Sequence, residues 1–228
     1  MEPSVNFRDW EVKATLEWRK TQFRRPVNPQ PPITINSAQY GNYAFSRVQK
    51  SKWYWMEGEL IRGDLESFKC PFGKVGDRLW VRENAYIAKK NFGSEWNCID
   101  TDGDKRLVGY AATMNEESVR CAKDYGVRQS PSIHMPRWAS RITLEITGVR
   151  VEWVQETCPE DVISEGISYK SLYGSFPIPD YDSFIEYEER QIISAYRDYW
   201  DSIYAKKYPW KSNPMVWVVE FKRIGDGK

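Results

Sequence analysis

Residues 16–25 read LEWRKTQFRR and are followed by Pro26. The stretch holds four cations and two aromatic side chains. Apolar residues upstream recur with helical spacing, and Pro26 disfavours a helical conformation at Arg25. We therefore predict an amphipathic helix that ends near Lys20 and passes into an extended segment. Cations held where a helix meets a strand are preorganised, so this junction is a candidate site for phosphate or carboxylate groups.

The whole chain is almost neutral, with 33 Lys and Arg against 32 Asp and Glu in 228 residues. A protein with a net charge of +1 has no overall field that would hold it on a nucleic acid or a membrane, so any anion site must be local. The hydrophobic content of 41% is enough for a core. We predict a single domain that spans residues 1–228.

No apolar run approaches the roughly 20 residues of a membrane span, and the first residues lack the pattern of a secretion signal. We expect no membrane partner and a cytoplasmic location. The four cysteines lack Cys-x-x-Cys spacing, which indicates reduced thiols: Cys70, Cys98, Cys121 and Cys158. We expect no metal and no other cofactor, the alternative being a metal site that these thiols and His134 assemble in space.

Alternating apolar and polar residues predict strands at 78–83, 140–154 and 215–224. In the second strand the alternation changes phase at Gly148, which predicts a β-bulge. Bulged and strongly twisted strands are common in small barrels.

Two helices are predicted in the second half of the chain. Thr157 and Glu160 have the spacing of a capping box and begin a short helix that stops at Gly166. Helical spacing of apolar residues predicts a longer helix from Asp182 to about Lys206. The order of helix, strands, two helices and strand lacks βαβ regularity, so we predict an α+β fold around a small barrel.

Two segments interrupt this order. The Pro-rich residues 27–32 exclude a helix or a central strand, and a hairpin is predicted around Gly58. Residues 88–137 lack sustained periodicity apart from a short predicted helix at 115–123. We predict two irregular insertions, at about 27–69 and 88–137.

These motifs resemble the ASCH signature of the PUA-like superfamily, in which a Lys is followed five positions later by an Arg, as Lys20 is by Arg25. ASCH-type proteins of bacteriophages and prophages share an opening Arg-Lys-Thr-Gln-x-Arg-Arg, which is similar to residues 19–25. Further segments follow in the family's order: GDRLWV at 76–81, ITLEITGV at 142–149, SEG at 164–166 and VVEF at 218–221.

The resemblance implies a PUA-like open β-barrel flanked by helices, with a cleft beside the first helix where relatives bind RNA or modified bases. It also implies a phage protein in the cytoplasm of a bacterial host. Some small ASCH proteins hydrolyse N4-acetylcytidine, and others are described as ribonucleases. Lys20 matches the amidohydrolase lysine, and Glu165 lies where the family has its acidic residue. Phe23 occupies the position of the nucleophilic threonine, and a phenyl ring cannot attack a carbonyl.

Our first hypothesis is a binding cleft for RNA or a modified nucleotide, with DNA as the alternative polymer. Cations would contact phosphates and aromatic rings would stack on bases, and each stacked base would contribute on the order of 1 to 3 kcal/mol. The predicted cationic contacts are Arg19, Lys20, Arg24, Arg25, Arg82 and Arg137, and the predicted stacking residues are Trp18, Phe23, Trp80 and Trp138. The alternative is that the tryptophans are core residues and the arginines form surface ion pairs.

The second hypothesis is a hydrolase that uses the same cleft. Lys20, with a lowered pKa, would activate a hydroxyl or a water, and Glu165 would protonate the leaving amine. Thr21 is the neighbouring hydroxyl, although in an extended segment it points away from Lys20. In a ribonuclease, Glu165 or His134 would transfer protons while the cations stabilise the phosphate. Lys20 and Glu165 could equally form a plain ion pair.

The third hypothesis is a protein-interaction module. In this case the aromatic insertions, including Trp53 and Trp55, would contact a host or virion protein. The first two hypotheses depend on one placement, because they require Lys20 and Glu165 to meet at a single cleft.

Overall fold

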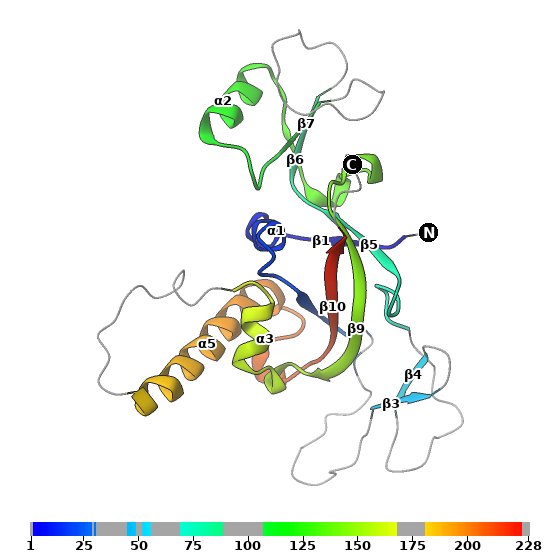
Figure 1. Cartoon of the computed structure of the whole chain (residues 1–228), viewed down its shortest axis with the longest axis vertical. Helices are drawn as coiled ribbons and strands as arrows, with labels where there is room; N and C mark the ends of the chain where they lie inside the picture. Colours follow the sequence, from blue (N-terminus) through cyan, green and yellow to red (C-terminus); the bar gives the residue numbers. More distant parts are fainter. Residues whose placement is uncertain are drawn as a thin grey trace.

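A five-stranded sheet forms the centre of the chain (Figure 1). The structure is a computed structural model that describes residues 2–28, 30, 45–48, 52–55, 69–88, 107–167 and 181–224. In spatial order, the strands of the sheet are β1 (Ser4–Asn6), β5 (Arg78–Arg82), β9 (Thr143–Trp153), β10 (Met215–Ile224) and β2 (Gln22–Pro26). β1 is parallel to β5, and the other neighbouring pairs are antiparallel. The three predicted strands are confirmed as β5, β9 and β10.

The described residues form four α-helices: α1 (Asp9–Leu16), α2 (Glu116–Asp124), α3 (Pro159–Ser164) and α5 (Tyr181–Tyr204). They also form 3₁₀ turns: η1 (Ser132–His134), η2 (Arg137–Ala139), η3 (Val154–Glu156) and η4 (Trp210–Ser212). The predicted long helix from Asp182 is confirmed as α5. α1 ends before the predicted position near Lys20, because Trp18 adopts a left-handed φ of 62°. None of the described helices combines the length and the apolar character needed to cross a bilayer.

The pairing of β9 with β10 contains the predicted bulge. Glu220 lies opposite Gly148, whereas the next residue of β10 lies opposite Ile146. Thr147 is therefore the extra residue of a β-bulge beside Gly148. The extra residue restores the inward direction of apolar side chains after the phase change, so both halves of β9 contact the same core.

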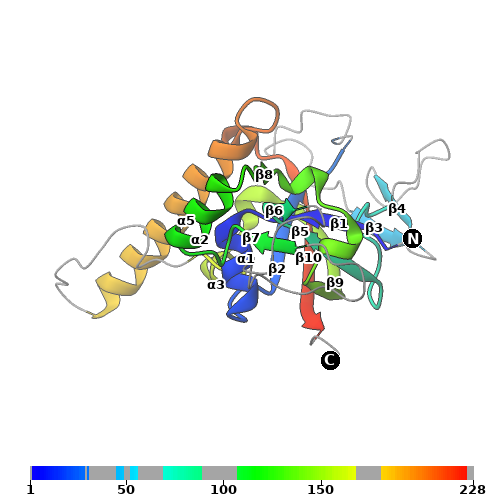
Figure 2. The ribbon, with the colours of Figure 1, turned by 90° about the horizontal axis from the view of Figure 1, so that it is seen from above.

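Strand β10 is buried on both faces. Val219 and Phe221 pack in a core that also includes residues of α1, β1, β5 and β9. Val216 and Val218 point to the other face and pack with residues of α3 and α5. Both helices lie on the same side of β9 and β10 (Figures 1 and 2). The alternation in β10 therefore separates two cores rather than a core and solvent.

A second sheet lies at the opposite end of the long axis from α5 (Figure 1). Its strands, in spatial order, are β7 (Leu107–Tyr110), β6 (Ala85–Ala88) and β8 (Gln129–Ser130). α2 packs against it, and its N-cap is Asn115, whose side chain accepts a hydrogen bond from the Ser118 amide. The predicted helix at 115–123 is confirmed. The description of 88–137 as irregular is wrong for its described part, because strand pairing between distant residues leaves no local periodicity.

β4 (Lys52–Trp55) pairs with β3 (Phe45–Val48) in an antiparallel hairpin. The hairpin predicted around Gly58 stays a prediction, because Gly58 and residues 59–62 lie outside the described part. The capping box predicted from Thr157 and Glu160 is wrong. The N-cap of α3 is Cys158, and the Thr157 hydroxyl instead donates to the main-chain oxygen of Val154 at 2.7 Å.

The class of the fold is mixed α+β, as predicted. Among the residues that the structure describes, the sheets have five, three and two strands, and the five-stranded sheet is open because its edge strands β1 and β2 do not pair.

Gly166 ends α3 as predicted and is required for two reasons. Its φ is +85°, in the region that favours glycine. A Cβ at this position would also lie 2.7 Å from Ala14 Cβ and 3.1 Å from Lys20 Cβ. The end of α3 therefore touches the chain where α1 passes into β2.

We expect Gly166→Ala to lower the free energy of unfolding by about 2 to 4 kcal/mol, combining the left-handed backbone cost with overpacking. Gly76→Ala is the matched control, since Gly76 has a φ of +88° but no atom within 4 Å of an added Cβ. This control should lose only about 1 to 2 kcal/mol. Urea denaturation measures both, and equal losses would argue against the close approach.

Candidate functional site

Lys20 and Glu165 lie together, although 145 residues separate them. Their main chains form an isolated β-bridge, and Lys20 Nζ donates to the main-chain oxygen of Glu165 at 2.9 Å. The neighbouring Thr21 amide donates to the Ser164 oxygen at 2.8 Å. The hydrogen bond from Lys20 reaches the backbone of Glu165, so the two side chains do not form the plain ion pair considered from the sequence.

The carboxylate beside Lys20 belongs to Glu11 of α1, with Oε1 3.4 Å from Nζ. Both side chains are buried. Burial lowers the pKa of Lys20, and the carboxylates of Glu11 and Glu165 offset this only in part. Burial raises the pKa of Glu11, but the cations of Lys20 and Arg25 outweigh it and hold that pKa below its usual value. Sequence reasoning missed Glu11, because an acidic residue on a short helix resembles a surface charge.

Extended backbone places alternate side chains of the junction on opposite sides. Lys20, Gln22 and Arg24 are buried and contact residues of α3 or its end. Thr21 is exposed, as the same alternation predicts. Phe23 is fully buried in the core, where its ring contacts other phenylalanines, and is not open to a base.

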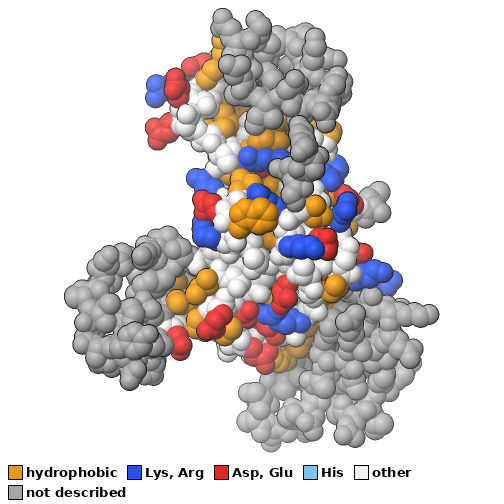
Figure 3. Space-filling view, viewed as in Figure 1, with side chains coloured by type: hydrophobic (Ala, Val, Ile, Leu, Met, Phe, Trp, Pro, Cys, Tyr) orange, Lys and Arg blue, Asp and Glu red, His pale blue; other side chains and the backbone are white. Residues whose placement is uncertain are grey.

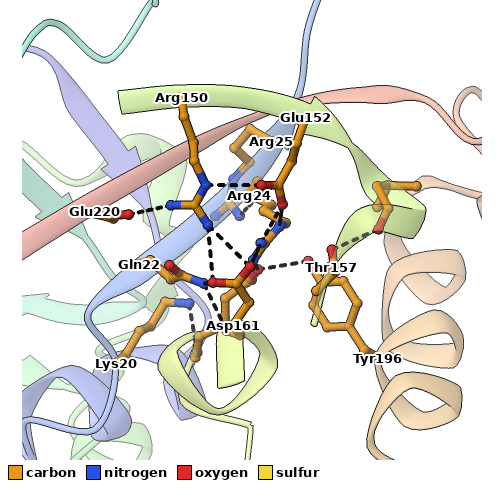
Figure 4. A network of polar contacts seen from close by, with 12 residues as sticks. Lys20, Gln22, Arg24, Arg25, Arg150, Glu152, Thr157, Asp161, Tyr196 and Glu220 are labelled. Carbon is orange, nitrogen blue, oxygen red and sulfur yellow. Dashed lines mark hydrogen bonds and ion pairs between the residues drawn. The ribbon is translucent and has the colours of Figure 1, made fainter. Parts of the chain in front are cut away.

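Arg24 lies at the centre of a buried network (Figure 4). Its Nε and Nη2 donate to Glu152 Oε1 at 2.8 and 2.5 Å. Nη2 also donates to Asp161 at 2.6 Å, and Nη1 donates to Glu165 Oε1 at 2.7 Å. The Arg24 side chain has no exposed surface, and each of its three nitrogens binds a carboxylate. Enclosed in this way, it is not open to a phosphate from solvent.

Arg150 extends the network across the sheet (Figure 4). It binds Glu152 at 3.0 Å and Asp161 at 3.1 Å, and it also binds Glu220 of β10. Gln22 donates to both the main-chain and side-chain oxygens of Asp161 at 2.9 Å. Arg24 and Arg150 therefore share the carboxylates of Glu152 on β9 and Asp161 on α3.

Tyr196 connects α5 to the network. Its hydroxyl donates to Glu165 Oε1 at 2.8 Å. Burial and the Glu165 carboxylate raise the pKa of Tyr196, so the phenol stays protonated and remains a donor. Glu165 Oε1 thus receives two hydrogen bonds, from Arg24 and from Tyr196, in the interior of the protein.

A cleft of about 820 Å³ lies beside α1. It is bounded by α1, the end of β2, η1 and the last turns of α5. The cleft is lined by Asn6, Phe7, Arg8, Asp9, Trp10, Glu11, Lys13, Arg25, Asn84, Ser132, Ile133, Tyr199, Ile203 and Tyr204. Cations and aromatic rings are therefore mixed around one hollow. Arg25 is the predicted site residue that lines it, whereas Lys20 and Glu165, expected to meet in the cleft, are buried and do not line it.

The polar groups of the cleft surround an aromatic pair. The rings of Trp10 and Tyr199 meet edge to face with centroids 5.3 Å apart, and the Arg8 guanidinium lies 5.8 Å from the Tyr199 centroid. Arg25 Nη2 is 3.8 Å from Glu11 Oε1, and this oxygen has no hydrogen-bond partner in the structure. The cleft thus combines ring surfaces and cations, beside a buried carboxylate oxygen that contacts two cations without a hydrogen bond.

Three of the predicted nucleic-acid residues gather on β5 and η2. The guanidinium groups of Arg82 and Arg137 lie 4.7 and 5.7 Å from the Trp80 ring centroid. Trp80 is only 7% exposed, so its ring is covered by the arginines and the chain around it. Arg82 also donates to the main-chain oxygen of Ile133, a residue that lines the cleft. This cluster therefore borders the cleft without forming its lining.

The remaining predicted residues lie on the surface. Arg19 pairs with Glu17 and donates to the Gly166 oxygen at 3.0 Å. His134 is exposed in η1, and no described hydrogen bond or ion pair joins it to the catalytic candidates. Trp138 is exposed in η2.

Comparison with protein-family models, curated proteins and solved structures finds no match to this chain. Among the described side chains, no three His, Cys, Asp or Glu residues gather as metal ligands. Cys70, Cys121 and Cys158 are free thiols, and Cys98 lies outside the described residues. The function is therefore argued from the geometry of the cleft.

We expect Arg24→Met to lower the free energy of unfolding by about 3 to 5 kcal/mol, because it leaves three carboxylates without their shared cation. The control is Lys222→Met, which breaks the exposed pair with Glu145 and should cost less than about 1 kcal/mol. Denaturant titration of both variants tests the expectation. Similar losses would mean that the network contributes little to stability.

Asp161 makes this network sensitive to acid. Burial raises its pKa, but the Gln22 hydrogen bond and the cations of Arg24 and Arg150 outweigh burial and hold it below the usual value. A carboxyl with a lower pKa in the folded state stabilises the protein above its unfolded pKa, and this contribution is lost as the pH falls through the folded pKa. We expect the free energy of unfolding to drop below about pH 4, and to drop less steeply in Asp161→Asn. Parallel pH profiles for the two proteins would contradict this.

Proposed function

We propose that this chain is a PUA-like ASCH protein that binds RNA or a modified nucleotide in the cleft beside α1. The observation that carries the proposal is the lining of the cleft, where Arg8, Lys13 and Arg25 surround the rings of Trp10 and Tyr199. A chain with a net charge of +1 concentrates three cations at one hollow that also presents aromatic surface. Cations for phosphates and rings for bases are the combination that single-stranded nucleic acids require.

The position of the cleft supports the same proposal. It lies beside the first helix, where the resemblance to PUA-like proteins places the ligand. Within the sequence motif, Arg25 takes the role of a ligand contact, since it lines the cleft and its side chain is 20% exposed. Lys20 and Arg24 lie behind this surface and hold it in place.

Binding is supported more strongly than hydrolysis. A catalytic lysine has to reach the reacting atoms, and the Lys20 side chain has no exposed surface. The Glu165 carboxylate is already bound by Arg24 and Tyr196. The protein-interaction hypothesis involves Trp53 and Trp55, whose side chains lie outside the described part of the structure.

The proposal is tested by fluorescence anisotropy with labelled single-stranded RNA and with DNA of the same sequence. We expect salt-dependent binding that Arg8→Gln weakens about tenfold, equivalent to about 1.4 kcal/mol, with a salt slope smaller by about 0.7 for the lost phosphate contact. Arg8 is exposed, so its replacement should not disturb the core.

The matched control is Arg197→Gln, which removes an exposed arginine of α5 that does not line this cleft. This variant should bind like the native chain. Absence of salt-dependent binding to either polymer and to free nucleotides, or equal weakening in both variants, would refute the proposal.

A further inference from the structure

Trp18 has a backbone conformation that its side chain disfavours. Its φ is 62°, and it directly follows Glu17, the C-cap of α1. Glycine is the usual residue at this position, because the left-handed region crowds any Cβ. Among the described residues, Asn213 is the other non-glycine with a positive φ, and asparagine tolerates that region. A tryptophan there is a genuine outlier, which points to a function that outweighs the strain.

Burial does not explain this tryptophan. The Trp18 side chain is 59% exposed, the largest exposure among the described large hydrophobic residues. Its described ring contact is with Arg223 of β10, whose guanidinium lies 4.0 Å from the ring centroid. Arg223 is itself oriented by a hydrogen bond to the main-chain oxygen of Leu16 at 3.4 Å. A cation held over one face of an indole leaves the opposite face open.

The surroundings of Trp18 suit a nucleic acid. Arg19 follows Trp18 in the sequence, and its side chain is 47% exposed. Lys13, which lines the cleft, lies on α1 five residues before Trp18, and Trp18 lies just beyond the C-cap of this helix. The face drawn in Figure 3 shows hydrophobic side chains among Lys and Arg side chains in its central part. α1 therefore connects the cleft, at its first turns, to Trp18, just past its C-terminal end.

We propose that Trp18, oriented by Arg223, is a stacking platform for an unpaired base of a nucleic-acid strand that continues out of the cleft. This inference rests on the proposed function and adds a second contact point to it. The other predicted stacking residues are less suited, because Phe23 is fully buried and Trp80 is covered by arginines. An indole that stacks on any base needs no sequence-specific hydrogen bonds, so the contact should be tolerant of base identity.

The test is Trp18→Gly, because a platform and a structural residue predict opposite results for it. Glycine relieves the left-handed strain, so we expect the Tm to stay the same or to rise by about 2 to 4 °C. Binding of a single-stranded oligonucleotide of about ten residues should weaken about 5- to 100-fold. Trp18→Phe keeps an aromatic face and should recover most of the affinity.

Ligand length separates this inference from the proposed function. A mononucleotide fills only the cleft, so Arg8→Gln should weaken its binding while Trp18→Gly should not. If Arg8→Gln weakens oligonucleotide binding but Trp18→Gly leaves it unchanged, the role of Trp18 as a stacking platform is overturned and the proposed function stands. A protein would then be the partner indicated for the Trp18 ring. A fall in Tm for Trp18→Gly, as for a packing residue, would also overturn it. Absence of any RNA or DNA binding by the native chain would overturn both proposals.

Discussion

The buried guanidinium of Arg24 is the interaction on which the rest of the structure depends. A cation taken out of water has to be compensated fully, and here three carboxylates from β9, α3 and the end of α3 supply the compensation. The carboxylates in turn need Arg24, because without it they would repel one another in a poorly hydrated space. Arg150 shares two of them, and Tyr196 adds a neutral donor from α5. The Arg24 side chain of β2 therefore holds β9 and α3 directly, and it holds α5 through Glu165 and Tyr196.

The same constraint shapes the cleft. Since β2 is extended, an inward Arg24 directs the next residue, Arg25, away from the network and toward α1. Glu11 lies between Lys20 and Arg25, so its charge is balanced from both sides while one oxygen keeps no hydrogen bond. The interior network and the surface that lines the cleft are two faces of one strand. Arg24 belongs to the network, and Arg25 lines the cleft.

Trp18, just past the C-terminal end of α1, combines a strained backbone with an exposed side chain. The C-terminal end of α1 carries a tryptophan where glycine would be more stable, and the side chain faces solvent instead of the core. Natural proteins accept such local losses of stability where the side chain has a role in recognition. By contrast, Gly166, a few ångströms away from Lys20, is the residue that its backbone requires.

Local patterns in the sequence determined the α+β class, the bulge beside Gly148, the strand at 215–224 and the extent of α5, because periodicity and glycine conformation act over short distances. Only the tertiary structure showed that both faces of this strand are buried. The meeting of Lys20 with Glu165 was expected from motif order, not from spacing. Tertiary structure alone decided that Glu11 is the carboxylate beside Lys20, that Arg24 turns inward while Arg25 lines the cleft, and that residues around α2 form a second sheet. These features depend on contacts between segments distant in the sequence, and such contacts leave no periodic signal in the residues that make them.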